Sequence, residues 1–96
     1  MENSLHQHVT HLKLNGNFIG SEHLKVLFQK PQQWNLKVLH LSNNNLADRD
    51  IEYILLHEEL KELDLSSNNA LTCEGIGQLS ELTGIKTLNL CTIHII

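Results

Sequence analysis

The fold is decided by an eleven-residue stretch in the first half of the chain, Leu36-Lys37-Val38-Leu39-His40-Leu41-Ser42-Asn43-Asn44-Asn45-Leu46. Leucines occupy its first, fourth, sixth and eleventh places, and an asparagine occupies the ninth. Similar spacings of apolar residues begin at Val9, Leu60 and Ile85, which gives periods of 27, 24 and 25 residues. Self-similarity at such a period indicates a repeat architecture, in which each unit buries its apolar face against its neighbours.

A second apolar pattern follows the first in each of two units. Three apolar residues lie 15, 18 and 19 places after Val9 and again after Leu36, namely Leu24, Leu27 and Phe28, and then Ile51, Ile54 and Leu55. Offsets of three and four residues place side chains on one face of a helix. The sequence therefore predicts a short strand and then a helix in each unit, with helices at about 21–29 and 49–56.

The ninth-place asparagine recurs in three units in register, as Asn17, Asn44 and Asn68. With these copies the chain resembles the leucine-rich-repeat family, whose L-x-x-L-x-L-x-x-N-x-L motif corresponds to a short parallel strand and the turn after it. The resemblance implies an α/β solenoid with a parallel sheet of about four strands on the concave face and helices on the convex face. It also implies that the three asparagines form a ladder of hydrogen bonds along the solenoid.

The resemblance extends over nearly the whole chain. We expect a lead-in at residues 1–8 and a repeat domain at 9–96, divided into 9–35, 36–59, 60–84 and a partial unit at 85–96. The last unit has Ile93 in place of the asparagine, so the ladder should end at Asn68. Because no helix pattern follows that strand, we expect the apolar residues at this end to promote self-association.

Individual residues predict how the helices begin and end. Ser21 and Asp48 are expected N-caps, and Thr72 is a weaker one. Gly75 and Gly77 predict that the third convex segment is the least regular, and Gly84 is expected to be a left-handed C-cap. The single tryptophan, Trp34, is expected to pack over an edge of the core.

The composition argues against nucleic acid and membranes as binding partners. The net charge is −4, and the seven Lys and Arg residues form no basic run, which disfavours nucleic acid. No apolar run is long enough for a membrane span, and the N-terminus lacks a signal-peptide pattern. With Cys73 and Cys91 as the two cysteines, both expected to be free thiols, we predict a cytoplasmic protein without a membrane partner.

Signals of catalysis are weak throughout the sequence. There is no phosphate-binding loop, zinc-protease helix or nucleophile elbow, and the two glycines of Gly75-Ile76-Gly77 lack the third glycine of a dinucleotide site. Seven histidines raise the question of a metal, but no cysteine or carboxylate completes a recognisable ligand set around them. We therefore expect no enzymatic activity, no cofactor and no metal.

Residues between the inward leucines should face outward on the concave side, where the family frequently binds proteins. The resemblance therefore implies a protein-binding face, whose candidate residues are His11, Lys13, Lys37, Val38, His40, Lys61, Glu62, Asp64, Lys86, Thr87 and Asn89. Further outward positions are Thr10, Asn15, Ser42, Ser66 and Cys91. The alternative is that these are merely solvated positions of a structural spacer. Such a spacer would be part of a larger regulatory protein of this family, such as a small-GTPase regulator, a ubiquitin-ligase adaptor or a receptor.

Overall fold

The computed structural model describes residues 8–30 and 34–90. Four short strands form one parallel sheet in the order β1-β2-β3-β4, with bounds β1 His11–Lys13, β2 Val38–His40, β3 Glu62–Asp64 and β4 Thr87–Asn89. The middle residues Leu12, Leu39, Leu63 and Leu88 are aligned across it. The sheet thus has the parallel order and the spacing that the repeat predicts.

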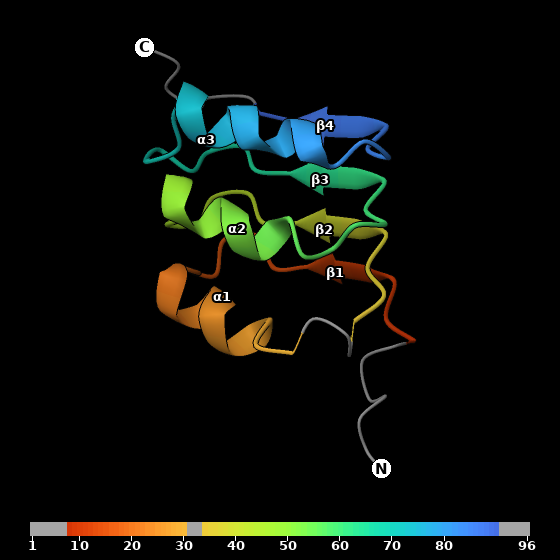
Figure 1. Cartoon of the computed structure of the whole chain (residues 1–96). Coiled ribbons are helices and arrows are strands. Elements are labelled where there is room, and N and C mark those ends of the chain that lie inside the picture. The colour runs from red at the N-terminus through yellow and green to blue at the C-terminus, as the bar shows by residue number, and fades with distance from the viewer. Residues whose placement is uncertain (1–7, 31–33, 91–96) are drawn as a thin grey trace.

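A helical segment follows each of the first three strands, and together these segments stack in one column beside the column of strands (Figure 1). The first is α1, Ser21–Leu27. In the second repeat a 3₁₀ turn at Asp48–Asp50 leads into α2, Ile51–Ile54. In the third, α3 at Cys73–Gly77 continues as a 3₁₀ turn at Gln78–Glu81. The second segment mixes the two helix types in the same way, so the prediction that the third is the least regular is not confirmed.

The core lies between the two columns and consists mostly of leucine and isoleucine. Leu39 and Leu63 have no exposed surface, whereas Leu88 in the same register position is 41% exposed. The inner strands are covered by a repeat on each side, but β4 has a described strand only on one side. Burial of one such leucine stabilises the fold by about 1.5 to 3 kcal/mol, so the inner strands carry most of the stability.

Trp34 closes one edge of this core, as predicted. Its ring contacts the Phe28 ring edge-on at a centroid distance of 5.4 Å. Its Nε1 donates a hydrogen bond to the Leu27 carbonyl at 3.1 Å. The indole is therefore fixed in orientation by both an apolar and a polar contact.

Two asparagines connect successive repeats through their buried side chains. Asn44 Oδ1 accepts from the backbone N–H groups of Asn17 and Ile19, both at 2.9 Å, and its Nδ2 donates to the Leu14 carbonyl at 3.0 Å. Asn68 repeats the pattern one unit later and accepts from Leu46 N–H at 3.1 Å. Each amide thus satisfies backbone groups that would otherwise be buried without partners.

The prediction that Asn17 belongs to this ladder is wrong. Its side chain is exposed, and within residues 8–30 and 34–90 its Nδ2 donates to the nearby Asn15 carbonyl, at 3.2 Å, and not to another repeat. Ladder asparagines bond back to the backbone of the preceding repeat, and the described chain places no repeat before β1. Asn17 therefore contributes its backbone N–H to the ladder and not its amide.

Two of the predicted helix caps are also wrong. Gly20 is the N-cap of α1, and its N–H donates to His23 Nδ1 at 3.2 Å, while Ser21 Oγ accepts from Arg49 Nε of the next repeat. In the second repeat the cap is Ala47, whose N–H donates to the Asp50 carboxylate at 2.9 Å. The N–H groups of Gly20 and Ala47 bond to side chains three residues further along the chain, and Ser21 Oγ bonds to a side chain of the next repeat. The preference of helix N-caps for Ser or Asp was therefore misleading at these two helices.

Two further observations concern the third repeat. Thr72 caps α3 as predicted, accepting from Glu74 N–H at 3.3 Å. The prediction of a left-handed Gly84 is wrong, because Gly16 is the one glycine with positive φ among the described residues. The 3₁₀ turn ends earlier, at Glu81, with Leu82 as its C-cap, so no left-handed residue is needed at Gly84.

Candidate functional site on the concave face of the sheet

The concave face presents two rows of side chains across the four strands. Eight of the candidate residues lie on the strands, in the rows His11, Val38, Glu62, Thr87 and Lys13, His40, Asp64, Asn89. The remaining three, Lys37, Lys61 and Lys86, directly precede β2, β3 and β4. Neighbouring parallel strands lie about 4.8 Å apart, so the structure brings these residues together on one surface.

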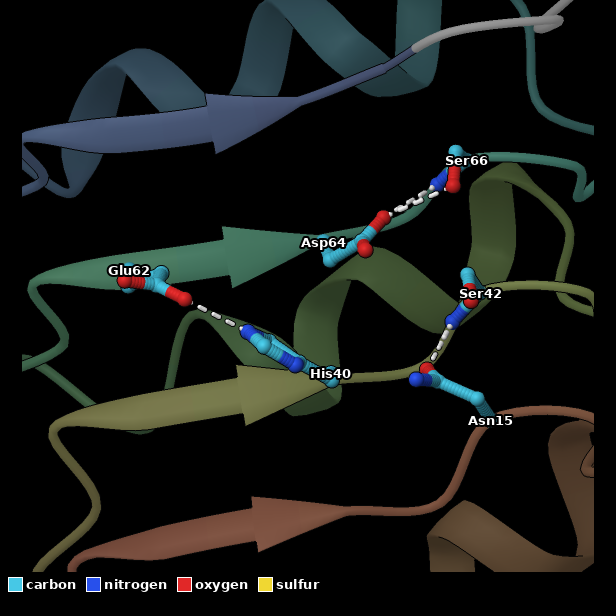
Figure 2. Close-up of polar contacts among 6 residues, drawn as sticks. All are labelled: Asn15, His40, Ser42, Glu62, Asp64 and Ser66. Carbon is cyan, nitrogen blue, oxygen red and sulfur yellow. Dashed lines mark hydrogen bonds and ion pairs between the residues drawn. The ribbon is translucent and has the colours of Figure 1, made fainter.

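One close polar contact on this face is diagonal between two strands. His40 Nε2 lies 2.6 Å from Glu62 Oε2, and Figure 2 shows the imidazole directed toward the carboxylate. The register places His40 beside Lys13 on one side and Asp64 on the other, not beside His11. His11 and His40 are therefore not register partners across β1 and β2.

Side chains at the ends of the strands are held by the turns that follow. Asp64 Oδ1 accepts from both the N–H and the hydroxyl of Ser66, at 3.0 and 2.8 Å (Figure 2). Asn15 Oδ1 accepts from Ser42 N–H at 2.8 Å. These contacts fix the orientation of one carboxylate and one amide before any partner arrives, which lowers the entropy lost on binding.

Glu59 is a member of this surface that sequence reasoning missed. It lies 2.5 Å from Lys37 Nζ, and the hydrogen bond from Lys37, reinforced by the lysine's charge, lowers the pKa of the Glu59 carboxyl. Glu59 belongs to the loop before β3 and not to a strand, so the alternation of inward and outward residues could not reveal it. Its place one residue before Leu60 is the signal that could have found it.

Charge is distributed unevenly over the face. Within the strands, β1 carries Lys13 and β3 carries the carboxylates Glu62 and Asp64, whereas Lys37, Lys61 and Lys86 directly precede β2, β3 and β4. On β4, Thr87 and Asn89 are uncharged and exposed. Such a surface offers hydrogen bonds and charges of both signs to a protein segment.

The described residues also bear on whether the chain has a metal site, a disulfide or a membrane span. Within residues 8–30 and 34–90, no group of three or more His, Cys, Asp or Glu residues could hold a metal ion. Cys73 is a free, exposed thiol, and Cys91 lies outside the described residues. Among the described helices, none has both the length and the apolar character needed to cross a membrane.

Comparison with protein families agrees with the repeat seen in the structure. A family model described as Leucine Rich repeat matches the chain three times, at residues 5–27, 35–55 and 59–80. The chain belongs to the leucine-rich-repeat family. Leucine-rich-repeat domains are generally protein-interaction modules. No significant match was found among curated proteins or among solved structures.

Proposed function

We propose that this leucine-rich-repeat protein binds a protein partner through the concave face of its sheet and acts without catalysis. The observation that carries the proposal is the ordered polar surface across β1 to β4, centred on His40, Glu62 and Asp64. The described helices lie to one side of the strands (Figure 1), so no helix of the described chain covers this surface. A cytoplasmic location, where its thiols stay reduced, is part of the same proposal.

Charge reversal on the two faces tests the proposal. Affinity purification with the whole chain is compared for the wild type, for Lys13→Glu with Asp64→Lys, and for the convex control Glu52→Lys. Because β1 and β3 carry opposite charges, the double change keeps the net charge but inverts the local pattern. Proteins recovered with the wild type and with Glu52→Lys, but not with the double variant, support concave binding. Recovery that depends only on Glu52 would contradict it.

A structural spacer within a larger regulatory protein is the second candidate function. It is favoured by the surface at β4, where Leu88 is 41% exposed and Ile76, Leu82 and Ile85 line an apolar groove. Such a groove suits the stacking of another repeat or of a second copy of the chain. The predicted contribution of Ile93, Ile95 and Ile96 lies outside the described residues. Unchanged protein recovery in the double concave variant would favour this spacer.

A further inference from the structure

A pocket of about 210 Å³ opens between two loops that belong to different repeats. One wall comes from the segment before β2 and includes Trp34, and the other comes from the segment between α2 and β3, with Leu56, His57 and Glu58. None of these residues belongs to the concave candidate set. The pocket therefore adjoins the concave surface at Glu59, but its other lining residues lie outside that surface, in the segments before β2 and β3.

The pocket has a rigid aromatic wall. The edge-on contact with Phe28 and the hydrogen bond from Nε1 to Leu27 hold the Trp34 indole in one orientation. His57, only 5% exposed, lies against Phe28 at a ring-centroid distance of 4.2 Å. A ligand would thus meet a preformed aromatic surface, with little side-chain entropy to lose.

The lining carries negative charge. Glu58 and Glu59 both line the pocket and are exposed. Glu59 is paired with Lys37, but Glu58 forms no ion pair with any residue that the structure describes. Burial lowers the pKa of His57 to about 4, so its imidazole is neutral at pH 7 and offsets none of this charge.

We propose that this pocket receives an arginine side chain of a protein partner. A guanidinium is planar, packs against aromatic rings and forms paired hydrogen bonds with a carboxylate. The aromatic wall at Trp34 and the carboxylate of Glu58 supply both requirements, and the volume accommodates one side chain. The ammonium of lysine lacks the flat apolar faces that an aromatic wall selects.

Trp34 makes the proposal directly measurable, because it is the single tryptophan of the chain. The probe is the peptide acetyl-Gly-Arg-Gly-amide, titrated into the whole chain while tryptophan fluorescence is recorded. A peptide with citrulline in place of arginine tests the contribution of the positive charge, and a peptide with lysine tests the contribution of the planar shape. Both keep the peptide backbone unchanged. For so small a ligand we expect half-saturation on the order of 1 mM.

Glu58→Gln should raise the half-saturation concentration about threefold, as expected for an exposed charge pair. Glu52→Gln, a change of the same chemistry on the exposed side of α2, should leave it unchanged. Circular dichroism confirms that both variants are folded. The proposal is overturned if the citrulline or lysine peptide binds as well as the arginine peptide, or if Glu58→Gln titrates like the wild type. The variant with Lys13→Glu and Asp64→Lys should still bind the arginine peptide. Failure of this proposal can therefore be distinguished from failure of the proposed function.

Discussion

The Asp48 carboxylate accepts hydrogen bonds from both the backbone N–H and the hydroxyl of Thr72, 24 residues further along the chain. The residue that caps α3 is therefore itself held by the preceding repeat. Gly75 makes room for this contact, since a Cβ there would lie 2.2 Å from Asp48 Oδ1. One acidic side chain thus connects the convex segments of the second and third repeats.

Asp48→Ala should lower the free energy of unfolding by about 1 to 3 kcal/mol, because the N–H of Thr72 loses its partner. Gly75→Ala should also destabilise, because the new methyl group displaces the carboxylate. Urea denaturation measures both, with the exposed Glu52→Ala as control. If Asp48→Ala and Glu52→Ala have the same midpoint, the connection contributes nothing to stability.

Asn44→Ala should be more destabilising than either Asn45→Ala or Asn17→Ala. The Asn44 amide bonds to backbone groups of two repeats, whereas the other two side chains are exposed. A lost partner for a buried polar group costs about 1 to 3 kcal/mol. Thermal denaturation of the three variants measures the difference, and equal midpoints for Asn44→Ala and Asn45→Ala would contradict the assignment of the ladder.

Leucines at the same register position of different strands should contribute unequally to the free energy of unfolding. We expect Leu39→Ala and Leu63→Ala to cost about 2 to 5 kcal/mol each, since both are fully buried. Leu88→Ala should cost much less because its side chain is already partly in water. Val38→Ala on the concave face should be mild as well. A larger loss for Val38→Ala than for Leu39→Ala would mean that the two faces of β2 are assigned in reverse.

His57 should make the fold sensitive to moderate acid. Its pKa falls from 6.5 to about 4 on folding because burial disfavours the charged imidazolium. Between these values the unfolded chain binds more protons than the native state, so stability decreases as the pH falls. From pH 7 to pH 5 the loss should be about 2 kcal/mol.

Urea denaturation at the two pH values tests this assignment for His57. His57→Gln should remove most of the stability loss between pH 7 and pH 5 that the imidazole causes. His8→Gln, a change at an exposed histidine, should retain that loss. Comparison between variants cancels the contributions of the carboxylates. Identical pH dependence in the wild type and in His57→Gln would show that the buried imidazole does not control the acid response.

The exposed end at β4 should make the isolated chain associate as its concentration rises. The groove that includes Leu82, Ile85 and Leu88 offers apolar surface beside a strand edge. Leu88→Lys should weaken association, whereas the exposed Thr83→Lys should not. Sedimentation velocity over a wide concentration range measures both. A wild-type chain that stays monomeric throughout would contradict the prediction.

The strands and their register could be predicted because one physical requirement, burial of leucine on a repeating face, sets them. The row through Leu39 and Leu63 follows directly from that spacing. The caps at Gly20 and Ala47 could not be predicted in this way, because His23 and Asp50, each three places further on, supply the acceptors. Local preference for Ser or Asp at a cap gave no indication of this.

The contacts of the candidate site depend on information that one repeat does not contain. The pairing of His40 with Glu62 is diagonal, so it depends on side-chain rotamers as well as on register. The pocket at Trp34 and Glu58 joins loops from different repeats. Sequence periodicity identified the face, but the arrangement of its polar groups and the pocket beside it required the structure.

The offset of 24 residues between β2 and β3 sets the length of the second repeat. Residues 36–59 bond backward through Asn44 and forward through Asp48, so they carry one donor or acceptor set for each neighbour. A duplicated copy of this segment, inserted in tandem, would set Asp48 of one copy against Asp48 and Ile51 of the next, in the places where it now meets Thr72 and Gly75. Lengthening the protein by whole repeats would therefore require different residues at the new junction, even though the sheet itself could grow one strand at a time.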